Sequence, residues 1–217
     1  GVLQDRPGRE DGEDVRFGPD GEPVFRIEGN EIGLRVPGMH SVRNALAAYA
    51  SGRVLGASSE DAAEALSEFS APKMRMEIVE RDGMTIINDA YNANPLSMRA
   101  AAETLALMRR DRPGRLVAAL GDMRELGAMT VEAHHEVGRL FGTLVPETLI
   151  LVGEHAPDYR EGALGAGMKV DAVHIFGTAG DAAEYLRSVV RTGDMVFVKG
   201  SRALGMERLV VSQDGKA

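Results

Sequence analysis

A carboxylate, a phenol and an amide fall within one short turn of this sequence. Asp89 follows the apolar segment TIIN, and Tyr91 and Asn92 come next in the string DAYNANP. If TIIN is a strand of a parallel sheet, these groups lie where such sheets bind ligands, beyond the carboxyl ends of the strands. The combination suits a ribose or an amide-bearing ligand.

A second polar cluster follows the apolar segment MVFV. Lys199, one of four lysines in the chain, comes directly after it, and Gly200, Ser201 and Arg202 complete the string KGSR. Ammonium, hydroxyl and guanidinium groups favour an anion-binding loop, and glycine allows close approach to the backbone. The ammonium of Lys199 must point either into the sheet edge or toward a partner carboxylate.

A third loop, LGDMRELG, places Asp122 and Glu125 between glycines. Two carboxylates in such a loop could hold an ammonium group. For this loop and for KGSR, helix capping and ion pairing explain the residues about as well as function does.

His40 and Asn44 form another candidate pair. They are four residues apart and therefore share one face of an expected helix. The free N–H groups of a helix N-terminus beside them suit the polar edge of a nucleotide. A structural alternative, with His40 as the N-cap and Asn44 as a buried hydrogen-bonded amide, explains the spacing better.

Several common motifs are absent from the sequence. It has no GxxxxGK[ST] or GxGxxG string, so it has no phosphate-binding loop of this kind. It also has no Cys, no HExxH and no GxSxG, which excludes thiolate chemistry and a nucleophile elbow. His134 and His135 are adjacent and face different sides of a helix, so we expect no metal site there.

The elements that must position these groups alternate from Arg75 onward. A hairpin is expected over residues 76–88, around Asp82-Gly83. Later segments such as LVAAL are apolar throughout, as is typical of strands covered on both faces. The pattern predicts a doubly wound α/β fold with a mostly parallel sheet and helices on both faces. Expected strands after the hairpin are 116–120, 148–152, 172–175 and 195–198; expected helices are 95–110, 131–142, 156–166, 179–191 and 205–211.

The N-terminal part has a different organisation. Short antiparallel strands are expected at 15–17, 24–28 and 32–36, followed by helices over 40–55 and 58–69. Pro72 marks a break in the pattern. We therefore expect two domains, residues 1–72 and 73–217.

Composition limits the partners. The 217 residues carry a net charge of -8, which argues against binding to nucleic acid or to an anionic membrane. There is no run of about 18 apolar residues and no signal peptide pattern at the N-terminus. The expectation is a cytoplasmic protein.

Taken together and in order, five features resemble the ATP-dependent Mur ligases of bacterial peptidoglycan synthesis. They are GMHSVRNALAA at 38–48, Arg75 ahead of the hairpin, DAYNANPLSM at 89–98, LGDMRELG at 120–127 and KGSRALGME at 199–207. The resemblance covers nearly everything from residue 24 onward.

This resemblance implies a three-domain enzyme of which the chain is a part. Residues 1–72 resemble the tail of the central ATP-binding domain, and residues 73–217 resemble the Rossmann-like third domain. The P-loop, the Mg²⁺ ligands and the UDP-sugar domain have no counterpart here. We therefore expect a monomeric fragment that is inactive alone.

The resemblance also implies a reaction. The carboxylate of UDP-N-acetylmuramoyl-tripeptide takes the γ-phosphoryl group of ATP, and the amine of D-alanyl-D-alanine attacks the acyl phosphate. One alternative is another Mur-type or folylpolyglutamate-type ligase with a different amine substrate, although DAYNANP and KGSR argue against it. A non-catalytic nucleotide-binding Rossmann-like module is the other.

Site residues follow from the same resemblance. Arg75 and Lys199 are implied as catalytic residues, and Arg75 would reach the phosphates. Residues implied near ATP are His40, Asn44, Arg75, Asp89, Tyr91 and Asn92. Residues implied near the dipeptide are Asp122 and Glu125 at its amine, and Lys199, Ser201 and Arg202 at its carboxylate. One departure is Ser41, where the family usually has Asn after the histidine.

Overall fold

The structure is a computed structural model that describes residues 13–110, 112 and 114–210. These residues form two compact units. One contains the described residues up to Ala71 together with Glu103–Arg112, and the other contains Pro72–Ala102 and the described residues from 114 onward. Within the described ranges, no helix has both the length and the apolar character needed to span a membrane.

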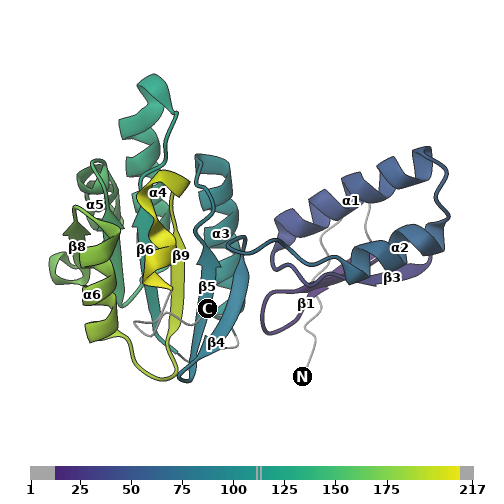
Figure 1. The fold of residues 1–217 in the computed structure, drawn as a ribbon, viewed down its shortest axis with the longest axis horizontal. Coiled ribbons are helices and arrows are strands. Elements are labelled where there is room, and N and C mark those ends of the chain that lie inside the picture. The colour runs from purple at the N-terminus through teal and green to yellow at the C-terminus, as the bar shows by residue number, and fades with distance from the viewer. Residues whose placement is uncertain (1–12, 111, 113, 211–217) are drawn as a thin grey trace. The chain divides into compact units, whose positions relative to one another are not determined.

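The second unit is built on a six-stranded sheet with the order β4-β5-β9-β6-β7-β8 (Figure 1). β4 pairs with β5 in antiparallel fashion, and all the other pairs are parallel. The predicted mostly parallel α/β sheet is therefore confirmed. Its strands are β4 (Glu77–Arg81), β5 (Met84–Asp89), β6 (Leu116–Gly121), β7 (Thr148–Val152), β8 (Val173–Phe176) and β9 (Met195–Lys199).

Helices cover both faces of this sheet, which explains the uninterrupted apolar strands. Every residue of β6, β7 and β9 is buried. On one face, α6 packs against alternate side chains of these strands. On the other face, Phe141 of α4 stacks on Phe197 of β9 with ring centroids 5.7 Å apart. The helices are α3 (Pro95–Met108), α4 (Thr130–Thr143), α5 (Ala156–Gly165) and α6 (Ala179–Val189).

α4 and α5 cross at glycines, which brings their backbones unusually close. A Cβ on Gly162 would lie 1.9 Å from the carbonyl oxygen of His135, and one on Gly138 would lie 2.0 Å from that of Tyr159. Only glycine fits at such a crossing. The close approach places side chains at the start of α4 and in α5 beneath the loop that follows β6.

The expected last helix is not formed. Residues 205–211 were expected to be α-helical, but two short 3₁₀ turns are found, Arg202–Leu204 and Met206–Leu209. Gly205 lies between them in the left-handed conformation, with φ of 64°. A residue in that conformation interrupts a right-handed helix.

The first unit has a small sheet and two helices. Strands β1 (Glu13–Phe17), β2 (Pro23–Ile27) and β3 (Asn30–Gly33) are antiparallel neighbours in that order. Helices α1 (Met39–Val54) and α2 (Ser59–Glu68) follow them. Phe25, Ile32, Val42, Tyr49 and Ala63 are among the residues of the core.

Candidate functional site at the carboxyl edge of the sheet

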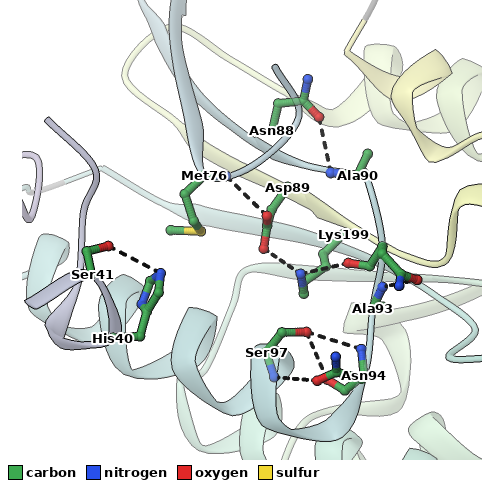
Figure 2. A network of polar contacts seen from close by, with 11 residues as sticks. His40, Ser41, Met76, Asn88, Asp89, Ala90, Ala93, Asn94, Ser97 and Lys199 are labelled. Carbon is green, nitrogen blue, oxygen red and sulfur yellow. Dashed lines mark hydrogen bonds and ion pairs between the residues drawn. The ribbon is translucent and has the colours of Figure 1, made fainter. Parts of the chain in front are cut away.

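The turn after β5 is held by a buried ion pair. Asp89 and Lys199 are register partners on the neighbouring strands β5 and β9. The Lys199 ammonium donates to Asp89 Oδ2 at 2.5 Å and to the Asn92 carbonyl oxygen at 2.9 Å (Figure 2). Lys199 is only 2% exposed and Asp89 9%. The sequence left two directions open to the Lys199 ammonium, into the sheet edge or toward a partner carboxylate. In the structure it points to a partner carboxylate, that of Asp89.

The segment before β4 is fastened to the same turn. The Met76 N–H donates to Asp89 Oδ1 at 3.1 Å (Figure 2). The Tyr91 N–H donates to the Met74 carbonyl at 3.1 Å. Arg75 lies between these two bonds, and its guanidinium carbon is 4.2 Å from the centre of the Tyr91 ring. Arg75 and Tyr91 are both exposed. A cation and an aromatic ring are thus presented together at the sheet edge.

Asn92 and Asn94 complete this turn in different ways. Asn92 is exposed, while its backbone carbonyl accepts the Lys199 bond. Asn94 Oδ1 accepts from the Ser97 N–H at 2.8 Å, a bond that caps the start of α3 (Figure 2). Asn92 Oδ1 accepts from the Ala93 N–H at 2.8 Å, so this exposed amide stabilises the turn itself, whereas Asn94 caps the helix.

The loop after β9 is joined to the loop after β6. The Ser201 N–H donates to the Asp122 carbonyl at 3.0 Å, and Ser201 Oγ accepts from the Arg124 N–H at 3.0 Å. A Cβ on Gly200 would lie 3.0 Å from the Gly121 Cα, so glycine is needed for this approach. Arg202 is exposed and pairs with Glu207 at 3.3 Å.

Asp122 anchors the β6 loop to the start of α5. Its carboxylate is 1% exposed and accepts the N–H groups of Glu154 at 2.9 Å and His155 at 3.1 Å. Glu125, in contrast, is exposed and has a φ of 64°. The two carboxylates that the sequence placed together thus differ in accessibility: Asp122 contacts backbone, and Glu125 faces solvent.

Two buried side chains that sequence reasoning did not select also hold this loop. His134 Nε2 accepts from the Met123 N–H at 2.9 Å, and the Tyr159 hydroxyl donates to the Gly121 carbonyl at 3.1 Å. Burial lowers the pKa of His134, and burial raises the pKa of Tyr159 well above its ordinary value. The sequence feature that could have identified His134 as a buried contact is its position on the apolar face of α4, beside Ala133 and Val137.

Together these bonds form one continuous network across four neighbouring strands. Lys199 joins the turn after β5 to β9, Ser201 joins the β9 loop to the β6 loop, and Asp122 joins the β6 loop to the segment after β7. Parallel strands bring all four loops to one edge. The exposed polar and aromatic side chains carried by these loops and by the segment before β4 are Arg75, Tyr91, Asn92, Glu125 and Arg202.

His40 and Asn44 belong to the first unit. The N-cap of α1 is Gly38, with φ of 93°, and Asn44 is exposed. The structural alternative of a His40 cap and a buried Asn44 amide is therefore wrong. Ser41 is buried, and its hydroxyl donates to the Pro37 carbonyl at 2.9 Å. Ser41 thus serves the helix start, where the family usually has an amide.

The described part of the chain contains no group of three or more His, Cys, Asp or Glu residues that could hold a metal ion.

Residues 74–202, more than half of the chain, match the family described as Mur ligase, glutamate ligase domain. The chain belongs to the Mur ligase family. It is 35% identical over 189 residues to the UDP-N-acetylmuramoyl-tripeptide--D-alanyl-D-alanine ligase of Bacillus subtilis, a match over 86% of this chain and 41% of that protein. The chain therefore spans less than half the length of this relative.

One solved structure agrees with this assignment, and a second has the same fold. MurF from Acinetobacter baumannii superposes with a TM-score of 0.78 at 32% identity, over 92% of this chain and 43% of that one. MurF from Thermotoga maritima, crystallised in complex with ADP, gives a TM-score of 0.71 at 24% identity over 92% of this chain and 44% of that one.

Proposed function

We propose that this chain is part of an ATP-dependent ligase that adds D-alanyl-D-alanine to UDP-N-acetylmuramoyl-tripeptide. In this proposal, residues 1–72 are the end of the central ATP-binding domain and residues 73–217 are the Rossmann-like third domain. The observation that carries it is the single network in which Lys199 and Asp89, Ser201 and Asp122 join the loops at one sheet edge.

The network has two sides with different chemistry. On the β5 side, Arg75, Tyr91 and Asn92 are exposed and offer a cation, an aromatic face and an amide, which suit the phosphates and ribose of ATP. Asp89 is too deeply buried to be the first contact, so its part is to hold the turn.

On the β6 side, the exposed side chains of Glu125 and Arg202 suit a zwitterion. D-alanyl-D-alanine carries an ammonium group, which is complementary to Glu125, and a carboxylate, which is complementary to Arg202. Asp122, Ser201 and Lys199 are committed to backbone and ion-pair contacts within the network. We assign these three residues to fixing the loops that carry Glu125 and Arg202.

Amide formation needs activation because a carboxylate is a poor electrophile. When ATP and Mg²⁺ are bound, they supply the phosphoryl group and part of its charge neutralisation. Arg75 adds a guanidinium beside that group, and such preorganised charge is a major source of catalysis. A P-loop and Mg²⁺ ligands would have to come from residues outside this chain. We propose that the reaction takes place in the cytoplasm, because its substrate is UDP-linked. We also propose that the enzyme is a monomer.

One part of the network is also compatible with a different function. A non-catalytic Rossmann-like binding module could contain the same buried Lys199–Asp89 pair, with the lysine in a purely structural role. The exposure of Arg75 and its position over Tyr91 favour the ligase, because a structural arginine would be paired and covered.

The test is an assay of phosphate release by the full-length enzyme with UDP-N-acetylmuramoyl-tripeptide and ATP. Release should depend on D-alanyl-D-alanine and not on D-alanine, L-lysine or diaminopimelate. Arg75→Gln should lower kcat by about a hundredfold, whereas Arg99→Gln, an exposed control 3.8 Å from Glu136, should change it less than about twofold.

Each negative result has a distinct meaning. Phosphate release with a free amino acid but not the dipeptide would assign the chain to another ligase of the family. ATP binding without any amine-dependent release would support the binding module. Turnover by the 217-residue chain alone would contradict the proposed need for a P-loop from elsewhere.

A further inference from the structure

His134 lies fully buried at the start of α4, directly beneath the β6 loop. Its Nε2 accepts from the Met123 N–H at 2.9 Å, and its Nδ1 lies 2.6 Å from the Thr130 carbonyl oxygen. A carbonyl can only accept, so Nδ1 must carry a proton, and Nε2 must not. These two contacts assign the neutral ring with the proton on Nδ1.

The groups around this ring come from two elements and the loop. His155 and Tyr159 lie with ring centroids 4.7 Å from that of His134, and Tyr159 meets it edge-on. His155 is itself 2.9 Å from Asp158, and Asp122 is a charged residue of the loop that acts on the ring. Burial and His155 oppose protonation of His134, while the bond to the Thr130 carbonyl, Asp122 and Asp158 favour it. Burial is the largest effect and lowers the pKa of His134.

The loop above His134 has three separate anchors in three consecutive residues. The Asp122 carboxylate contacts the start of α5, the Met123 N–H contacts His134, and the Arg124 N–H contacts Ser201. Glu125 follows at once in a left-handed conformation that an ordinary residue does not favour. The position of the Glu125 carboxylate therefore depends on these anchors, and the middle one is a titratable side chain.

We propose that neutral His134 is a positioning residue that holds Glu125 toward the incoming amine, and that protonation of its ring releases the loop and weakens binding of the amine substrate. A protonated Nε2 would direct an N–H at the Met123 N–H, and two donors repel each other. The inference rests on the proposed function, because that function assigns the amine to this loop.

Nuclear magnetic resonance on the 217-residue chain tests the contact itself. The nitrogen shifts of His134 should show the Nδ1–H tautomer at neutral pH. As the pH falls, the Met123 amide signal should move with the same midpoint as the His134 ring, below about 6.5. The inference would be overturned by a ring that carries its proton on Nε2 at neutral pH, or by a Met123 amide shift that does not change as the ring titrates.

Kinetics on the full-length enzyme test the consequence. His134→Gln keeps an acceptor near the Nε2 position but cannot titrate, so KM for the dipeptide should stay near the original value and no longer rise at low pH. His134→Leu has no acceptor and should raise that KM by about tenfold at every pH. KM for ATP should not change in either variant. His135→Gln, next to it on α4, should keep the original pH profile.

The outcomes separate this inference from the function on which it rests. An enzyme without amine-dependent turnover would end both. An enzyme that ligates the dipeptide with a KM that neither pH nor His134→Leu alters would overturn the inference and leave the function intact. Equal increases in KM for dipeptide and ATP in His134→Leu would indicate general damage and also overturn it.

Discussion

Lys199 and Asp89 illustrate how single residues carry the candidate site. Lysine is almost never fully buried unless it is paired, and here both partners are buried and lie 2.5 Å apart. Their attraction offsets a large loss of hydration only while both are present. The pair therefore makes the turn that carries Tyr91 and Asn92 depend on the strand that carries KGSR.

Removal of one charge from this pair should be costly. We expect Asp89→Asn to lower the free energy of unfolding by about 3–5 kcal/mol, because it leaves a buried ammonium without its anion. The double variant Asp89→Asn/Lys199→Met should recover part of this loss. Urea denaturation measures both.

The control is an exposed pair. Glu136→Gln breaks the surface ion pair with Arg139, which is 2.7 Å long, and should cost less than about 1 kcal/mol. If Asp89→Asn lowered the free energy of unfolding no more than this control, the buried pair would not stabilise the fold as its geometry suggests.

Tyr159 gives a prediction about alkaline pH. Burial raises its pKa well above the ordinary value, so the folded state keeps a phenolic proton that the unfolded chain releases near pH 10. Its stabilising contribution is therefore complete below about pH 10 and is lost as the pH rises further. Tyr159→Phe should unfold with a weaker alkaline dependence than the original chain.

Urea titrations at about pH 8 and about pH 11 would measure this difference. Tyr159→Phe should also cost about 1 kcal/mol at pH 8, because it removes the bond to the Gly121 carbonyl. Tyr91→Phe, at an exposed tyrosine, should leave both values unchanged. An identical pH dependence in Tyr159→Phe and the original chain would refute the prediction.

At the scale of elements, the connection between β7 and α5 requires glycine at position 153. Its φ is 121°, and a Cβ would lie 2.4 Å from the Asp122 carboxyl carbon. We expect Gly153→Ala to lower the free energy of unfolding by about 2–4 kcal/mol through backbone strain and displacement of Asp122.

Gly177 is the matched position in the connection between β8 and α6. A Cβ there would meet nothing within 4 Å, so Gly177→Ala should change stability by less than about 1 kcal/mol. Thermal unfolding of both variants makes the comparison. Equal effects would mean that the Asp122 contact does not constrain the β7–α5 connection.

Most elements could be predicted from sequence because their signals are local. Apolar runs identified β6, β7 and β9, and Ser58 and Thr178 cap α2 and α6 as their types suggest. The last helix could not be predicted correctly, since only the structure shows Gly205 in a left-handed conformation. Local pattern does not contain that information.

The sequence could predict which residues gather at this sheet edge, but not how they pair. Strand ends marked Asp89, Asp122 and Lys199, yet Lys199 and Asp89 are 110 positions apart and meet only because β9 lies between β5 and β6. Strand order is a property of the whole sheet. The role of His134 was hidden for the same reason, as its partner Met123 lies outside its helix.

For the whole molecule, the two units differ in the size of their cores. Among the described residues, the core cluster of the first unit has seven buried members, whereas the cluster on one face of the second unit's sheet has fifteen. Because buried apolar area sets the free energy of local opening, amides of α1 should exchange with solvent at a lower free energy than those of β6 and β9. Native-state hydrogen exchange of the chain measures this, and equal protection in both units would contradict it.

The anchors of the β6 loop have a consequence for the divergence of enzymes in this family. All three side chains accept from main-chain N–H groups: Asp122 from those of residues 154 and 155, His134 from that of residue 123, and Ser201 from that of residue 124. Every amino acid except proline provides such a group. The outward side chain at 124 can therefore vary during evolution without loss of these bonds, and the one at 125 can vary among residues that tolerate its left-handed backbone. Selection for a new amine can act on these two positions one substitution at a time.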